Sequence, residues 1–285
     1  MKVYDISKEN IPEFASYVGE DIADDMKRKF YRGYGVKDDD GSVAGVLVYE
    51  VLGTENDDED VRSAFRFLKA ESKEAYSLLH QSYREDGTDD DEIEKSTYQF
   101  EDEEPADSCE EQGFSKEQKE SDLARISLKD ASGMDFVSKL KIPDHIVSID
   151  MLSMMQFRTA IRNCLFNGQK GLLEDLGNLS MGWFDIELST CTIMDDEVKG
   201  LFLVRVTPSG TIIPVLLFVQ GADSRKNLAR MIACSVKKAQ EKYLPETQIE
   251  INCARSSTGA LVNKLFPDVV RKTAYCGSRS EVFWD

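Results

Sequence analysis

The chain has 285 residues, with 35 Lys and Arg against 53 Asp and Glu, which gives a formal net charge of −18. This excess of negative charge argues against a nucleic-acid partner, because binding to phosphate backbones depends on a basic surface. No stretch reaches the roughly 20 apolar residues that a transmembrane helix needs, and no basic segment followed by an apolar run opens the sequence. We therefore expect a cytoplasmic protein that contacts no membrane.

The cysteines favour the same compartment. They are spread without the C-x-x-C spacing of zinc or redox sites, so we expect reduced thiols and no metal site. The six residues are Cys109, Cys164, Cys191, Cys234, Cys253 and Cys276.

In chain order, the first half is predicted to open with a strand at 3–6. A strand at 43–51, a strand at 64–68, a polar loop at 69–74 and a helix at 75–83 follow, and a strand at 121–128 closes this half. Acidic runs at 57–60, 89–92 and 101–104 are interpreted as solvated loops. The alternative is that they attract a cationic acceptor such as a polyamine, an aminoglycoside or a lysine-bearing peptide.

The second half repeats the order. A strand at 146–149 is followed by strands at 200–206 and 212–219, joined by the turn residues 208–210. A polar loop at 220–227 leads into a helix at 228–243, and a strand at 249–251 comes next. Because a chain of this length is about twice a common domain, two copies of one fold are the economical interpretation.

The loop at 220–227 is a candidate anion site. A loop that feeds a helix N-terminus presents free backbone N–H groups and the positive end of the helix dipole. Arg225 and Lys226 add charge there, so a pyrophosphate could bind. The alternative is a polar connection whose basic residues are simply solvated.

This segment resembles the GNAT superfamily of acyl-CoA-dependent N-acyltransferases. The phosphate-loop pattern Q/R-x-x-G-x-G/A finds Gln220 at its first position, with Asp223 in place of the first glycine and Arg225 in place of the last small residue. At the six specified positions of the downstream pattern N-x-x-A-x-x-L-Y-x-x-x-G-F, this chain has Arg255, Thr258, Leu261, Val262, Phe266 and Pro267. Val262 therefore stands where family members carry the tyrosine that protonates the leaving CoA thiolate.

The resemblance implies an α/β (α+β) protein of two tandem GNAT-like domains, each a mixed, mostly antiparallel sheet flanked by helices. We expect a domain at 1–131, a linker at 132–144 and a domain at 145–285. Acetyl-CoA or another acyl-CoA is the implied co-substrate and a small-molecule or peptide amine the implied acceptor, selected by the helices near 157–179. The implied CoA-binding residues are Phe218, Val219, Gln220, Gly221, Ala222, Ser224, Arg225, Lys226 and Asn227.

The first copy departs further from the family pattern. Its loop at 69–74 has no glycine and carries two acids, which would repel a pyrophosphate, and Cys109 stands at the tyrosine position. We interpret this copy as mainly structural. Two alternatives to an acyltransferase stay open: a non-catalytic binding or scaffolding protein, and a sensor in which one copy binds CoA or a nucleotide while the other contacts a protein.

No catalytic residue is assigned from the sequence. A general base could come from Asp185, Glu187 or Glu250, and Tyr275 is the tyrosine that could replace the missing acid. The histidines, His80 and His145, are interpreted as surface or packing residues away from the loop.

Overall fold

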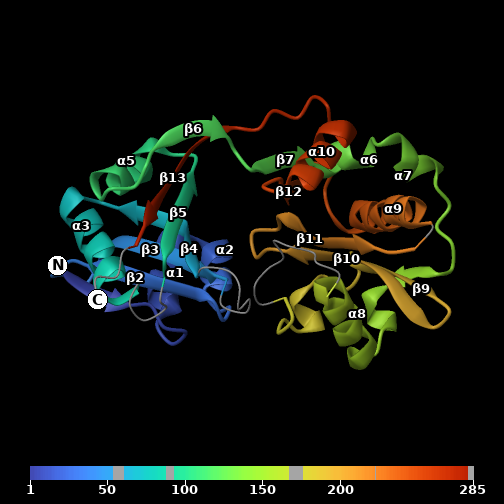
Figure 1. Ribbon diagram of the computed structural model, residues 1–285, viewed down its shortest axis with the longest axis horizontal. Coiled ribbons are helices and arrows are strands. Elements are labelled where there is room, and N and C mark those ends of the chain that lie inside the picture. Colours follow the sequence, from blue (N-terminus) through green and yellow to red (C-terminus); the bar gives the residue numbers. More distant parts are fainter. Residues whose placement is uncertain (54–60, 88–92, 167–175, 222, 282–285) are drawn as a thin grey trace. The chain divides into compact units, whose positions relative to one another are not determined.

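The structure, a computed structural model, describes residues 1–53, 61–87, 93–166, 176–221 and 223–281 (Figure 1). Ala222 and the acidic runs at 57–60 and 89–92 lie outside these residues. The chain forms two compact units: Met1–Ser121 with Lys272–Asp285, and Asp122–Arg271. Each unit has its own sheet.

The first unit contains a seven-stranded sheet of order β1-β2-β3-β4-β5-β13-β6, in which only the β4–β5 pair is parallel among the described strands. The strands are β1 (Lys2–Asp5), β2 (Tyr31–Lys37), β3 (Val43–Leu52), β4 (Arg62–Ala70), β5 (Lys95–Phe100), β6 (Glu117–Glu120) and β13 (Thr273–Ser280). The helices are α1 (Ile11–Val18), α2 (Glu20–Asp25), α3 (Lys73–Ser82), which continues into a π-helical turn at Tyr83–Gly87, and α5 (Glu103–Glu111).

The second unit contains a six-stranded sheet of order β7-β12-β11-β10-β9-β8, with one parallel pair, β11–β12, among its described strands. Its strands are β7 (Leu123–Ser127), β8 (Ile146–Ser148), β9 (Thr190–Met194), β10 (Glu197–Val206), β11 (Ile212–Val219) and β12 (Gln248–Asn252). Its helices are α6 (Leu128–Ser132), α7 (Asp135–Lys139), α8 (Met154–Phe166), α9 (Ser224–Lys242) and α10 (Ser256–Leu265), with short 3-10 turns at Ile149–Met151 and Met181–Trp183.

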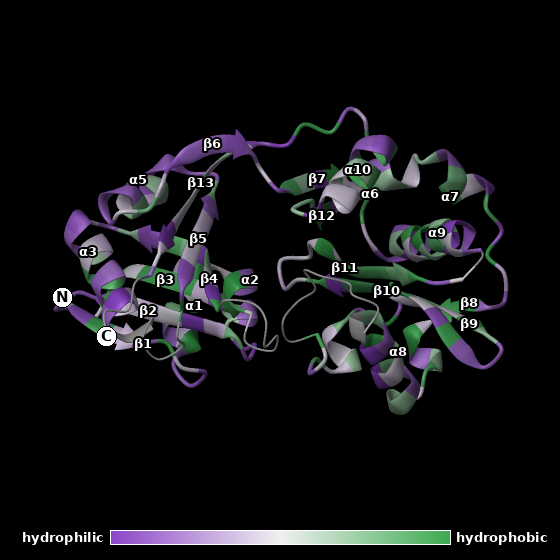
Figure 2. Cartoon of the chain, viewed as in Figure 1, coloured by the Kyte–Doolittle hydropathy of each residue, from purple (hydrophilic) through white to green (hydrophobic). Residues whose placement is uncertain are grey.

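Both sheets are covered on two faces, which explains why their central strands are hydrophobic without alternation. On β10, Phe202 and Val204 pack in the core beneath α9, whereas Leu201 and Leu203 pack in the core with α8. The period of two sends neighbouring side chains to opposite faces. Figure 1 shows α9 and α8 on the two sides of β10 and β11, and Figure 2 shows these strands as largely hydrophobic, in contrast to β6.

The two units exchange their last strands. β7 follows β6 directly in the chain, yet it pairs with β12 of the second sheet through five residues, from Leu123↔Asn252 to Ser127↔Gln248. β13, at the end of the chain, inserts between β5 and β6 of the first sheet. Each sheet therefore contains one strand that the chain order assigns to the other half.

This exchange accounts for the difference between the observed units and the expected domains at 1–131 and 145–285. The strand expected to close the first domain belongs to the second unit, and residues 272–281 belong to the first. The segment expected to be a linker, 132–144, includes α7, whose Val137 is 2% exposed and packs in the core beneath α9. The linker is therefore part of the second unit.

Candidate functional site

A gap opens in the second sheet where two parallel strands diverge. Within the described strands, β11 and β12 share a single register pair, Ile212↔Ile249. Further along the same strand, β11 contains a β-bulge at Val215, since Leu203 pairs with Leu216 while Val204 pairs with Pro214. The rest of β11 has no partner on β12, which leaves backbone groups on that edge for other contacts.

The divergent strand leads directly to the start of α9. Its N-cap residue Asp223 makes no side-chain capping bond, and its first turn contains no acidic residue. Arg225 and Lys226 are exposed there, with the Lys226 ammonium 3.4 Å from the Asp223 carboxylate. Gly221 has φ of +96°, a conformation that favours glycine at the turn. A helix start of this kind suits an anion.

The predicted CoA-binding residues fall into three groups. Gly221, Arg225 and Lys226 are exposed, whereas Val219, Gln220 and Ser224 are half-buried, and the Gln220 N–H donates to the Lys199 carbonyl at 2.9 Å. Phe218 is 6% exposed in the core with α8, so that only its backbone is available. Asn227 is 3% exposed, and its amide faces inward.

The first unit has the same geometry at the corresponding place. Among the described strands, β4 and β5 pair from Arg62↔Lys95 to Phe65↔Tyr98, after which β4 continues paired with β3 but not with β5. Its bulge falls at Arg66, since Val48 pairs with Phe67 while Tyr49 pairs with Phe65. In both units the bulge therefore lies four residues before the end of the strand.

Solved structures share this fold. A tandem GNAT protein from the clavulanic acid biosynthesis pathway aligns over 100% of this chain and 99% of its own, with a TM-score of 0.60 and 10% identity. The chain has a tandem GNAT fold. A GCN5-related N-acetyltransferase from Sphaerobacter thermophilus aligns over 100% and 96% of the two chains, with a TM-score of 0.54 and 11% identity.

A further similar structure is a protein from Enterococcus faecalis V583 described as a probable N-acyltransferase, which aligns over 96% of this chain and 72% of its own (TM-score 0.51, 10% identity). No protein-family model matches the chain, and no curated protein matches its sequence. Similarity at this level of identity establishes the fold, while the chemistry must come from the site itself.

The two GNAT-like units differ at the helix that follows the gap. In the first unit, Ser72 caps α3 by accepting from the Ala75 N–H at 3.2 Å, and the exposed Glu71 and Glu74 flank this start. One N–H is therefore already satisfied, and the carboxylates repel an anion. The start of α9 has no side-chain cap, and the carboxylate at its N-cap, Asp223, is paired with the Lys226 ammonium, so an anion is favoured in the second unit.

The charge distribution between the units supports the same assignment. The second unit has 18 Lys and Arg against 17 Asp and Glu, a formal charge of +1. The first unit holds the remaining 17 basic and 36 acidic residues, a formal charge of −19. The net negative charge of the chain therefore comes from the first unit, and the nearly neutral second unit does not repel an anionic ligand.

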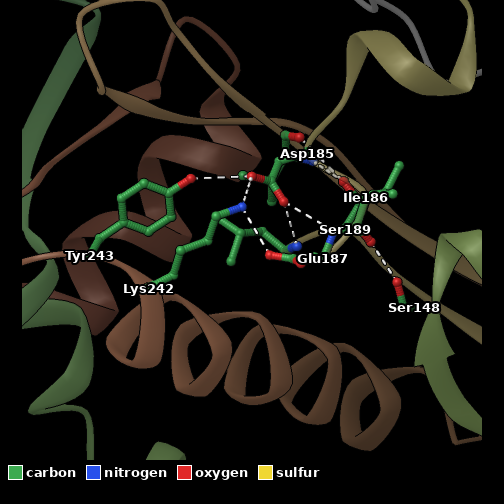
Figure 3. A network of polar contacts seen from close by, with 9 residues as sticks. Ser148, Asp185, Ile186, Glu187, Ser189, Lys242 and Tyr243 are labelled. Atoms are coloured by element: carbon green, nitrogen blue, oxygen red, sulfur yellow. Dashed lines mark hydrogen bonds and ion pairs between the residues drawn. The ribbon is translucent and has the colours of Figure 1, made fainter.

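The Asp185 carboxylate is held by several donors, which suits a structural role rather than that of a general base (Figure 3). Its carboxylate accepts from the Leu188 N–H at 2.9 Å, from the Lys242 ammonium at 3.1 Å and from the Tyr243 hydroxyl at 3.2 Å. Burial acts to raise its pKa, but these donors hold the pKa below its usual value. The carboxylate thus fixes the loop before β9 to the end of α9.

The other proposed proton carriers are also engaged or misplaced. Glu187 pairs with Lys242 at 2.9 Å, and Glu250 pairs with the Arg125 guanidinium at 2.9 Å between β12 and β7. Tyr275 lies on β13 and therefore in the first unit, where the Lys116 ammonium is 5.1 Å from its ring centre. Tyr275, which the expected domain bounds assign to the second copy, is therefore part of the first sheet.

The tyrosine position of the GNAT pattern is closed in both units. Val262 is 3% exposed and packs with Ala124 and Cys253. Cys109 is fully buried, and burial raises the pKa of its thiol, which stays protonated. Val262 has no ionisable group and the Cys109 thiol does not reach solvent, so neither can protonate a departing thiolate.

The histidines differ in their positions. His80 is 2% exposed in the first unit, as expected of a packing residue. His145 is half-buried, and its Nε2 lies 3.3 Å from the Asn227 Oδ1 in the first turn of α9. The expectation that His145 lies away from the loop was wrong. The pair explains why Asn227 faces inward.

Within the residues that the structure describes, no group of three or more His, Cys, Asp or Glu side chains is arranged to hold a metal ion. No helix in that part of the chain is long and apolar enough to cross a bilayer.

Proposed function

We propose that the second unit binds an acyl-CoA and transfers its acyl group to an amine. The observation that carries the proposal is the divergence of β11 from β12 beside the uncapped start of α9. The unpaired edge of β11 offers N–H and C=O groups to an extended amide-containing arm, as a neighbouring strand would. Arg225, Lys226 and the helix start would take the phosphates.

The chemistry asks little of the protein beyond positioning. The amine nitrogen forms a bond to the thioester carbonyl carbon, the C–S bond breaks, and the proton lost by the amine ends on the CoA sulfur. Holding the two reactants together supplies much of the acceleration. Since Val262 occupies the tyrosine position, we expect the proton to reach the sulfur through water, which gives slow turnover.

The test of binding is thermal unfolding with acetyl-CoA. Saturating ligand should raise the transition by an amount on the order of several °C, and Arg225→Glu with Lys226→Glu should abolish this shift. Lys141→Glu with Lys264→Glu is the matched control, because both lysines are exposed and lie away from the start of α9. The control should retain the shift. If no acyl-CoA shifts the wild-type transition, the proposal fails.

Transfer is tested separately by thiol release from acetyl-CoA in the presence of a panel of amines. Release that depends on the amine and is lost in the Arg225→Glu, Lys226→Glu variant supports an acyltransferase. Binding without release supports the alternative, a GNAT-fold binding or scaffolding protein. The buried Val262 and the paired carboxylates Asp185, Glu187 and Glu250 are the observations that favour this alternative.

A further inference from the structure

Arg255 carries a buried cationic nitrogen without a partner. Among the residues that the structure describes, its Nη2 has no hydrogen-bond partner, although the atom is shielded from solvent. Leaving a buried charged donor unsatisfied is costly, and native proteins contain few such groups. Such a residue is a candidate for binding a ligand that supplies the missing hydrogen-bond acceptor.

The backbone places Arg255 at the open end of the gap. β11 and β12 run parallel and separate after Ile212↔Ile249, so the residues that follow β12 face the widest part of the divergence. Arg255 is three residues beyond the end of β12 and is the N-cap of α10, with its own side chain making no capping bond. It therefore stands across the gap from the bulged part of β11.

The charge of Arg255 is close enough to α8, on the face of the sheet opposite α9, to act on one side chain there. Burial raises the pKa of the Cys164 thiol to about 11, and Arg255 is the charge that opposes this rise. Cys164 belongs to α8 and packs with Leu201 and Phe218 on that face. The phosphates of an acyl-CoA would lie at the start of α9, so a ligand of Arg255 is a separate group on the other side of the gap.

A carboxylate fits this position. A guanidinium is planar and presents parallel N–H donors that match the two oxygens of a carboxylate. One guanidinium balances the single charge of a carboxylate but only half the charge of a phosphate dianion. Arg255 is only partly buried as a residue, so a ligand can approach the guanidinium from its exposed part, and a rotation of the side chain would bring Nη2 to it.

We propose that Arg255 binds a carboxylate of the acceptor, and hence that the acceptor is an amine that also carries a carboxylate, such as an amino acid. This inference rests on the proposed acyltransferase function. In that arrangement the carboxylate is anchored on the α8 side, and the amine points into the gap toward the thioester.

The test measures binding without acyl-CoA, by ligand-observed NMR. The probes are 4-aminobutyrate and the common L-amino acids, each beside its carboxamide, which keeps the amine and removes the anionic charge. Wild-type protein should bind at least one carboxylate about 10-fold more tightly than its amide, and Arg255→Gln should remove the difference. Arg255→Lys, which keeps the charge without the fork, should retain part of it.

Lys264→Gln is the control, since it removes one positive charge from the exposed side of the same helix and should leave the preference intact. Thermal unfolding of Arg255→Gln should begin no lower than that of the wild type, because an unpartnered buried nitrogen stabilises nothing. A structural arginine would give the opposite result.

Three results would overturn the inference: no carboxylate preference in the wild type, a preference that survives in Arg255→Gln, or stronger binding of phosphoethanolamine than of any carboxylate. Because acyl-CoA is absent from this measurement, failure of the protein to bind acetyl-CoA would refute the proposed function without changing the result for Arg255.

Discussion

At the scale of single residues, His80 is an ionisable group whose pKa is shifted by burial in the first unit. Its Nε2 is 2.9 Å from the Ser108 hydroxyl, while its Nδ1 is buried and has no partner among the described residues. Burial, together with the positive charges of Arg279 and Arg84, lowers its pKa to about 4. The imidazole is therefore neutral in the folded protein near neutral pH.

This shift predicts a pH dependence of stability. Between pH 6.5 and about 4 the unfolded chain binds a proton at His80 that the folded chain does not. The contribution of the neutral imidazole to the free energy of unfolding is therefore fully present above pH 6.5 and is lost as the pH falls toward 4. The loss by pH 4 is about 3 kcal/mol. In His80→Phe this part of the loss should disappear, as followed by urea unfolding at a series of pH values. Ser108→Ala, which keeps the imidazole, should show the wild-type slope; an equally steep loss in His80→Phe would refute the assignment.

At the scale of elements, the sequence predicted the sheet strands and the long helix better than the site. Strands at 200–206 and 212–219 and a helix at 228–243 correspond to β10, β11 and α9, because hydrophobic runs and turn residues are local signals. The strand exchange is not local. Nothing in residues 123–127 indicates that they pair with β12, and nothing in residues 273–280 indicates that they join the first sheet, so Tyr275 was expected in the other copy.

The site was predictable only in part. The anion-binding helix start follows from residue order, whereas the bulge at Val215 and the divergence after Ile212↔Ile249 depend on strand register. The pairing of Asp185 with Lys242 and Tyr243 joins residues more than 50 positions apart. An arginine at position 255 was visible as a departure from the family pattern, but its unpartnered nitrogen is visible only in three dimensions.

Asp185 gives a prediction at this scale, because it joins the loop before β9 to the end of α9 (Figure 3). Asp185→Asn should lower the free energy of unfolding by about 1–3 kcal/mol, since the ammonium of Lys242 and the backbone donors lose a partly buried charged acceptor. Glu187→Gln is the matched control: it contacts the same lysine but is 64% exposed, so its effect should stay below about 1 kcal/mol. Urea unfolding measures both. An equal effect of the two changes would show that Asp185 has no special role.

At the scale of the whole molecule, the exchanged strands decide which segments can fold alone. β13 fills the position between β5 and β6, and a Cβ added at Gly277 would lie 1.7 Å from the Ser115 carbonyl oxygen. That close approach requires glycine and marks β13 as a fitted part of the first sheet. A fragment that ends at residue 121 would leave β5 and β6 without the strand between them.

The observed and the expected boundaries therefore make opposite predictions. The fragment 122–271 contains β7 and should unfold cooperatively in urea, whereas 145–285 lacks β7, α6 and α7 and carries β13 without its sheet, so it should be aggregated or unfolded. The Ser121 N–H donates to the Lys272 carbonyl at 2.7 Å, so joining 1–121 to 272–285 through a few glycines should give a folded first unit. Circular dichroism and urea titration of these fragments measure the outcome. Cooperative folding of 145–285 would show that β7 and β13 are dispensable additions rather than exchanged parts of the two sheets.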